Sequence, residues 1–201
     1  MKKLLPLGIV LAVFANYAVA AITVTILESG ANLVVSSSGT LNSGVCTSIA
    51  TGFTSNTNGI NPSSPTLAFG AVSSTQDQCA GTVITPTTGF GSGALLSATA
   101  DTGVSYYFDP NAGFWGPSGW GSSTAMTASM TFANASFASA GITPGTYMYT
   151  FSNGATTDTL TINAIVAPPA STPTLSAWGS MILLTLIALL GGRQYWRRRA
   201  R

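Results

Sequence analysis

The fold class is decided by the stretch Tyr147-Met-Tyr-Thr-Phe-Ser-Asn-Gly-Ala-Thr-Thr-Asp-Thr-Leu-Thr-Ile-Asn-Ala-Ile165. Its two ends are rich in aromatic and β-branched residues, and they flank a Ser-Asn-Gly-Ala turn at 152–155. Leu160, Ile162 and Ala164 alternate with polar residues, which places these apolar side chains on one face of a strand. The stretch therefore predicts a β-hairpin.

Further strands are expected on the N-terminal side of this hairpin. Residues 21–27 alternate in the same way, 28–31 form a turn, and 32–36 supply a partner strand. Short aromatic or alternating runs at 104–108 and 124–132 predict two more strands. Short strands separated by regularly spaced turns are typical of an all-β fold, either an antiparallel β-sandwich or a short barrel.

The rest of this part of the chain favours loops over helices. Residues 43–64 are rich in Gly, Ser, Thr and Asn, and we expect them to form loops. Lys, Glu, Gln and Arg, which favour helices, are almost absent between the two ends of the chain. Residues 21–166 are therefore expected to form one β-domain of ordinary size.

Charged residues are scarce and unevenly placed along the 201-residue chain. They make up only 6% of it, and histidine is absent. The basic residues lie near the two ends, at Lys2, Lys3, Arg193, Arg197, Arg198, Arg199 and Arg201, and the acids lie between them, at Glu28, Asp77, Asp101, Asp109 and Asp158. A body without cations cannot replace the counterions of nucleic acid, so no nucleic-acid binding is expected. The lack of histidine also removes the usual acid–base catalyst and zinc ligand.

The N-terminus has the parts of a secretory signal peptide. A basic start is followed by an apolar run over residues 4–14. Small residues then stand at Ala18 and Ala20, the positions that signal peptidase reads, which predicts cleavage before Ala21. Residues 1–20 are therefore interpreted as a signal peptide. The alternative is an N-terminal membrane anchor, for which the apolar run is short.

The C-terminus also has three parts. A Pro-rich linker and the start of a motif occupy residues 167–174, where proline favours extended backbone. The apolar segment 175–192 would extend over about 27 Å as a helix, close to the ~30 Å hydrocarbon core of a bilayer. The basic tail, 193–201, carries all the arginines of the chain and would stop transfer. The positive-inside rule then places this tail in the cytoplasm and the β-domain outside the inner membrane.

A recognisable motif joins the linker to the apolar segment. The pattern Ile-Pro-Thr-Leu-Ser-x-Trp-Gly is matched at Pro173, Thr174, Leu175, Ser176, Trp178 and Gly179, with Thr172 in place of Ile. Followed by an apolar segment and an arginine cluster, this motif resembles the bacterial IPTL-CTERM sorting signal, a relative of the PEP-CTERM signal. The resemblance implies an exosortase-type transpeptidase, cleavage near Pro173–Thr174 and transfer to a surface acceptor. A plain C-terminal membrane anchor is the alternative.

Cys46 and Cys79 are the only cysteines, and both lie in the expected exported domain. An oxidising compartment favours their pairing. They are too far apart for a Cys-x-x-Cys redox motif, and two thiolates without histidine do not make a zinc site. We therefore expect a structural disulfide, with no metal and no cofactor.

No set of catalytic residues stands out. The many serines lack a histidine or lysine base in the body of the chain. Glycoside hydrolysis would need two carboxylates close together, and the spacing of the five acids brings no two of them together. The chain is therefore not expected to be an enzyme, and a carboxylate-dependent hydrolase is kept as the third hypothesis.

The most distinctive internal stretch is Phe114-Trp-Gly-Pro-Ser-Gly-Trp-Gly121. On a Gly/Pro-rich loop, Trp115 and Trp120 could stack on sugar rings. In the alternative interpretation the aromatic side chains close one end of the sandwich. Similar stretches occur in small exported PEP-CTERM-type proteins, a resemblance that supports an exported β-domain and implies no reaction.

These observations together predict an exported bacterial surface or extracellular-matrix protein with a structural or adhesive role. Its expected partners are signal peptidase, an exosortase-type transpeptidase, transiently the inner membrane, and an exopolysaccharide or surface glycan. A low-charge surface rich in Ser, Thr and Gly suits a hydrated polymer. The second hypothesis is a carbohydrate-binding module that uses Trp115 and Trp120.

Overall fold

The computed structural model describes residues 21–54, 57–70, 73–85, 88–166, 181–182 and 184–186. The chain divides into two units, Met1–Ala167 and Pro168–Arg201, and every strand named below belongs to the first.

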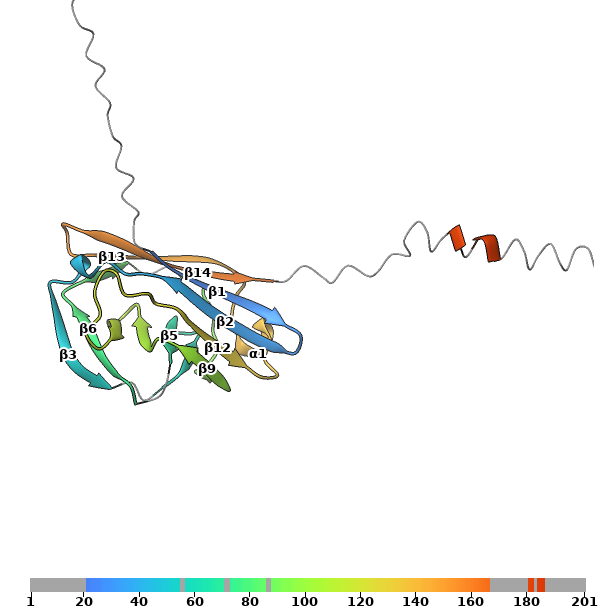
Figure 1. Cartoon of the computed structure of the whole chain (residues 1–201), viewed down its shortest axis with the longest axis horizontal. Coiled ribbons are helices and arrows are strands. Elements are labelled where there is room, and N and C mark those ends of the chain that lie inside the picture. Colours follow the sequence, from blue (N-terminus) through green and yellow to red (C-terminus); the bar gives the residue numbers. More distant parts are fainter. Residues whose placement is uncertain are drawn as a thin grey trace, which may run out of the picture. The chain divides into compact units, whose positions relative to one another are not determined.

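Two sheets of seven strands each form the described part of the first unit (Figure 1). The first sheet has the order β7 (Val83–Thr85), β13 (Gly145–Ser152), β14 (Thr157–Ile165), β1 (Ala21–Ser29), β2 (Asn32–Gly39), β12 (Ala128–Phe132) and β9 (Ala100–Gly103). The second sheet has the order β3 (Ser48–Thr54), β6 (Thr75–Ala80), β11 (Gly113–Pro117), β10 (Tyr106–Asp109), β5 (Thr66–Phe69), β4 (Gly59–Asn61) and β8 (Leu96–Ser97). A 3-10 turn, η1 (Ser43–Val45), and a short helix, α1 (Phe137–Ala140), accompany them. The expected all-β class is confirmed.

The hairpin that decided the fold class is present as β13 and β14. Tyr147 lies opposite Ile162 and Tyr149 opposite Leu160 in an antiparallel register. All four side chains are buried, at no more than 7% exposure. The turn between the strands includes Gly154 at φ +89°, a conformation that favours glycine. Alternation in the sequence therefore identified the inward face correctly.

The first hairpin, β1 and β2, is also confirmed. Ile22, Val24 and Ile26 are completely buried, and the antiparallel register sets Ile26 opposite Val35. Gly30, at φ +63°, allows the tight turn between the two strands. The two remaining predicted strands correspond to β10 and β12.

One strand pair departs from the expected antiparallel arrangement. β1 and β14 run parallel, with Val24 beside Ile162 and Leu27 beside Ile165. Because side chains alternate with the same period whatever the direction of the neighbouring strand, the sequence pattern identifies the buried face but not the direction of pairing. The first sheet is therefore mixed.

The expectation that residues 43–64 form only loops is wrong. This stretch contains η1, the edge strand β3 and the short strand β4. β3 is mostly exposed, and its register against β6 shifts between Ala50 and Phe53, where Gly52 has φ +90°. The irregularity interrupts the alternation of side chains, so a periodic pattern could not reveal this strand.

The two sheets share one hydrophobic core. Phe108 of β10 packs against Tyr149 and Phe151 of β13, with ring centroids 4.9 Å and 5.9 Å apart. Phe114 of β11 meets Phe151 at 6.0 Å, edge to face. In Figure 1, β1, β2 and β14 lie on the opposite side from β3 and β6. Contacts between the sheets, added to the strand pairs, therefore hold the domain together.

Most predictions about the two chain ends lie outside the described residues. This applies to Ala18 and Ala20, to the sorting motif 173–179 and to the arginines of 193–201. Of the apolar segment 175–192, residues 181–182 and 184–186 are described, and they are helical and exposed. No helix within the described ranges is long and apolar enough to cross a membrane.

Candidate functional site

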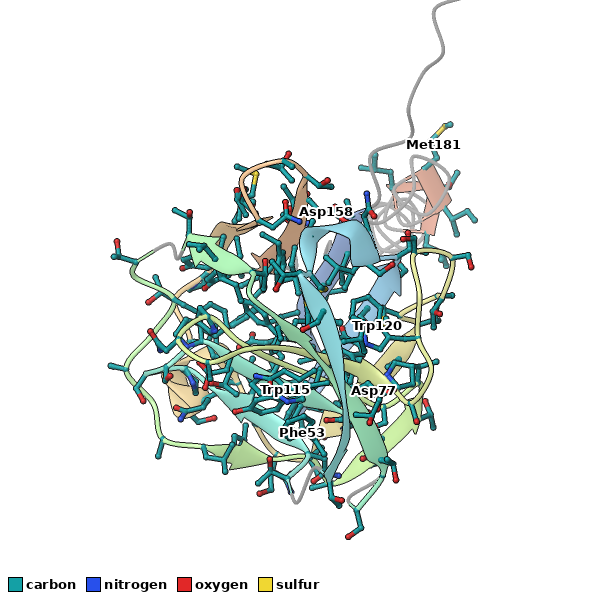
Figure 2. All side chains as sticks on the ribbon, turned by 90° about the vertical axis from the view of Figure 1, so that its left-hand side faces the viewer. Phe53, Asp77, Trp115, Trp120, Asp158 and Met181 are labelled. Atoms are coloured by element: carbon teal, nitrogen blue, oxygen red, sulfur yellow. A yellow bond between two sulfur atoms is a disulfide. The ribbon has the colours of Figure 1, made fainter. Side chains whose placement is uncertain are left out.

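The distinctive aromatic stretch is not one loop. Gly113–Pro117 forms β11, and only the residues after it form a turn. Because Phe114 points into the core, Trp115 points to the outer face of the second sheet. The two tryptophans named as glycan contacts therefore lie in different surroundings (Figure 2).

Trp120 is a core residue, and its prediction as a glycan contact is wrong. It is only 5% exposed, and its Nε1 donates a 3.0 Å hydrogen bond to the main-chain oxygen of Asp77. Its ring meets Phe114 edge to face at 5.4 Å. A Cβ at Gly116 would lie 2.5 Å from the indole, so the glycine makes room for the ring. This arrangement matches the interpretation in which the aromatic side chain closes the sandwich.

Trp115 instead joins two other rings in an aromatic surface, which we define as Phe53, Tyr107 and Trp115. Tyr107 of β10 is the register partner of Trp115, and their ring centroids are 5.0 Å apart. Phe53 of β3 lies 6.4 Å from Trp115 and is 40% exposed. Tyr107 and Trp115 belong to the consecutive strands β10 and β11, whereas Phe53 belongs to β3, much earlier in the sequence. Their proximity depends on the order of strands in the second sheet.

A polar side chain borders the Trp115 ring. Gln78 of β6 is the other register partner of Trp115 and is half-buried. A Cβ at Gly113 would lie 3.6 Å from both Nε2 of Gln78 and two atoms of the Trp115 six-membered ring. The indole and the Gln78 amide therefore both lie close to the backbone of Gly113. An aromatic face next to an amide offers stacking together with a hydrogen-bond donor and acceptor.

A series of hydrogen bonds leads away from the aromatic surface. The Tyr107 hydroxyl donates to Oδ2 of Asp109 over 3.3 Å, and Oδ1 of Asp109 accepts from the Asn111 amide at 2.8 Å. The Asn111 side chain donates to Oγ of Ser64 over 3.3 Å. Burial raises the pKa of the Tyr107 hydroxyl, and the Asp109 charge raises it further. The hydroxyl therefore remains a donor at neutral pH.

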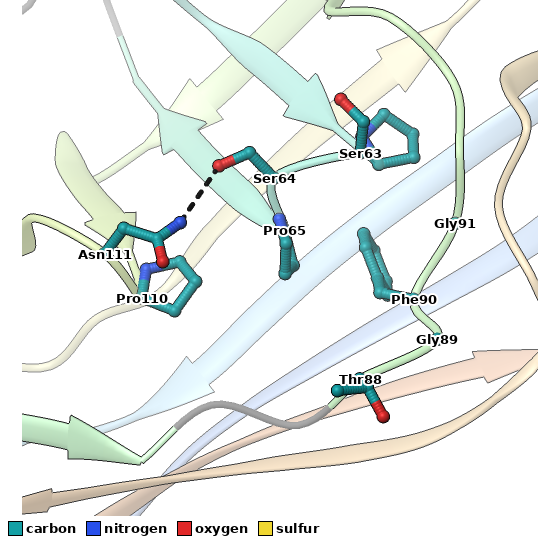
Figure 3. A pocket seen from close by; sticks show the side chains of 10 residues that line it. Ser63, Ser64, Pro65, Thr88, Gly89, Phe90, Gly91, Pro110 and Asn111 are labelled. Carbon is teal, nitrogen blue, oxygen red and sulfur yellow. Dashed lines mark hydrogen bonds between the residues drawn. The ribbon is translucent and has the colours of Figure 1, made fainter.

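A pocket of about 330 Å³ lies where this series ends (Figure 3). Its lining combines prolines, a phenylalanine and small polar residues: Pro62, Ser63, Ser64, Pro65, Thr88, Gly89, Phe90, Gly91, Pro110 and Asn111. Tyr147 supports one wall, because its hydroxyl donates to the carbonyl of Gly89 at 3.1 Å and its ring meets Phe90 at 5.1 Å. The pocket therefore has one wall that is held by the core.

Four of the five acids connect segments that are far apart in the sequence. Each accepts a hydrogen bond: Glu28 from the Phe137 amide, Asp77 from Gly119, Asp101 from the Asn58 side chain, Asp109 from Asn111, and Asp158 from Asn42. Within the described ranges, no three His, Cys, Asp or Glu residues gather to hold a metal. Each of the five carboxylates therefore accepts from an amide group of the same domain.

The predicted disulfide between Cys46 and Cys79 is present. It joins the residue after η1 to β6, which pairs with β3. Cys79 is 2% exposed and belongs to the core. The bridge thus ties the segment just before the edge strand β3 to the neighbouring strand β6.

Sequence reasoning missed Phe53, Tyr107, Gln78 and the pocket. Alternation in 104–108 could have indicated that Tyr107 faces outward, because Tyr106 and Phe108 on either side are buried. No local signal brings Phe53 or Gln78 to Trp115. No family model, curated protein or solved structure matches this chain.

Proposed function

We propose that this chain is an exported bacterial surface or extracellular-matrix protein, processed at an IPTL-CTERM-like signal and with a structural or adhesive role. One observation carries the proposal. β14 ends at Ile165, before the linker at 167–174. Both expected cleavages would leave the described core intact, because its residues lie between Ile22 and Ala164.

The chemistry of the domain supports export. A disulfide such as Cys46–Cys79 persists in oxidising compartments. The outward side chains of the three central strands of the first sheet include many uncharged hydroxyls, among them Thr23, Thr25, Ser36, Ser38, Thr159 and Thr161. Such a surface can exchange hydrogen bonds with a hydrated polymer.

Intact mass and terminal sequencing of the protein from the organism that makes it test the processing. We expect a mature chain from Ala21 to about Pro173. Trp178→Ala, within the sorting motif, should leave the tail attached, whereas the matched substitution Trp115→Ala should not. A wild-type chain that keeps Arg201 would show that the tail is only an anchor. Absence of the mature chain from surface and matrix fractions would contradict the structural role.

We also propose, as a second candidate, that the domain binds carbohydrate through the aromatic surface. The supporting observation is Trp115, half-buried between Phe53 and Tyr107 and beside the Gln78 amide. Trp120, which the sequence had paired with it, has no part in this proposal.

Affinity electrophoresis in gels that contain neutral polysaccharide tests this second candidate. We expect retardation that Trp115→Ala abolishes. Met148→Ala is the control, since Met148 is 54% exposed on a strand of the other sheet. Unretarded migration of the wild type in every neutral gel would overturn the proposal.

A further inference from the structure

Tyr107 belongs to two neighbouring features at once. Its ring packs against Trp115, 5.0 Å away, and its hydroxyl donates to Asp109. Asp109 accepts a hydrogen bond from the Asn111 amide, and this bond holds the turn that places Pro110 and Asn111 at the pocket. The aromatic surface and the pocket are therefore linked by consecutive residues of one strand and its turn.

The two features extend over more than one sugar ring. Side chains two residues apart on a strand, such as Tyr107 and Asp109, are separated by about 7 Å along it. The aromatic surface lengthens this distance further, because the ring centroids of Trp115 and Phe53 are 6.4 Å apart. One pyranose ring covers roughly one aromatic side chain, so a ligand that touched both Trp115 and Asn111 would contain several units.

The charges favour a neutral ligand. Asp109 lies in the middle of the linked features, and the chain has no Lys, Arg or His between residues 4 and 192. A uronate, sulfate or phosphate group would face a like charge with no cation to pair with it. Hydroxyl groups could instead pair with the exposed Asn111 amide and with Gln78.

We propose that the aromatic surface and the pocket form one elongated site for several consecutive units of a neutral polysaccharide. Trp115 and Tyr107 stack on sugar rings, and Asn111 positions the chain at the pocket. This inference rests on the proposed carbohydrate-binding function and adds the length and charge of the ligand.

Titration calorimetry of the full chain, in a detergent without a sugar headgroup, tests the inference. The probes are disaccharides, tetrasaccharides and hexasaccharides of β-1,4-linked glucose, β-1,4-linked mannose and α-1,4-linked glucose, with alginate as the anionic comparison. We expect the hexasaccharide of at least one neutral series to bind about tenfold more tightly than its disaccharide. Asn111→Ala should weaken hexasaccharide binding more than disaccharide binding and so reduce this gain, whereas Trp115→Ala should weaken both. Thermal melting confirms that each variant is folded.

The outcomes separate the two proposals. Binding that depends on Trp115 but not on chain length or on Asn111 would overturn the elongated site and keep the carbohydrate-binding function. Tighter binding of alginate than of every neutral series would overturn the charge argument and with it this inference. No binding of any probe would overturn both proposals.

Discussion

The indole Nε1 of Trp120 donates a 3.0 Å hydrogen bond to the main-chain oxygen of Asp77, which holds this tryptophan inside the domain. Gly119 reinforces the contact, since its amide donates to Oδ2 of the same aspartate at 2.7 Å. Trp115, five residues earlier in the sequence, stands on the outer face. The two tryptophans of this short stretch therefore have different roles: Trp120 stabilises the fold, and Trp115 belongs to the candidate site.

The two tryptophans should differ sharply in their effect on stability. Trp120→Ala empties a buried space and leaves the Asp77 carbonyl without its donor, which should cost about 3–5 kcal/mol. Trp115→Ala removes half-exposed ring contacts and should cost about 1 kcal/mol. Urea unfolding followed by circular dichroism measures both. Equal losses would show that the division of roles is wrong.

The disulfide should make a large contribution to stability. Cys46 and Cys79 are 33 residues apart, and closing a loop of that length contributes about 4 kcal/mol in the chain-entropy model. The double substitution to serine should lower the free energy of unfolding by about that amount. Adding dithiothreitol should destabilise the wild type and have no effect on the double variant. A reductant effect on the variant would point to a cause other than the bridge.

The buried hydroxyl of Tyr106 should lower the stability of the domain, and a substitution can test this. Its oxygen is buried without a hydrogen-bond partner among the described residues. Ser37 lies near it but donates its own hydroxyl to the Met126 carbonyl at 2.9 Å. Tyr106→Phe should therefore leave stability unchanged or raise it by about 1 kcal/mol, as thermal melting can show.

Tyr147→Phe is the matched control for this prediction. The Tyr147 hydroxyl shares its single proton between two carbonyl oxygens, at 2.7 Å from Thr143 and 3.1 Å from Gly89. Its removal should destabilise the domain by about 1–2 kcal/mol. If Tyr106→Phe proved as costly as Tyr147→Phe, the Tyr106 hydroxyl would have to be satisfied in solution.

Residues that alternate locally were predictable from the sequence. The alternation of Ile22, Val24 and Ile26 was enough to predict which face of β1 points inward, because one face of a strand must be buried. The disulfide was predictable for a different reason: only two cysteines exist, and both belong to the expected exported domain.

Features that depend on strand order were not predictable. β1 could pair with β14 in either direction and bury the same residues, so the parallel register left no trace in the sequence. The aromatic surface combines β3, β10 and β11, and Phe53 lies in an irregular edge strand. The roles of Trp115 and Trp120 could be separated only by knowing that β11 ends at Pro117.

The carboxylate of Asp158 joins the start of β14 to the segment that contains Asn42. Oδ2 accepts from the Asn42 amide at 2.6 Å, and Oδ1 accepts from its neighbour Thr159 at 2.7 Å. The side chain is 1% exposed. Loss of hydration raises the pKa of Asp158, and the two amide donors oppose the rise without cancelling it.

This raised pKa determines how stability should change with pH. Above it, the folded state holds a poorly hydrated charge that the unfolded state exposes to water. As the pH falls from neutral, the folded state takes up the proton first, so Asp158 should make the folded state more stable, until the unfolded aspartate also protonates near its ordinary pKa of ~3.9. Asp158→Asn does not titrate, and subtracting its free energy of unfolding from that of the wild type at each pH isolates this effect. The difference should grow in favour of the wild type as the pH decreases. A difference that shrinks over the same range would mean that the Asn42 and Thr159 amides outweigh burial, and that folding favours the charged form.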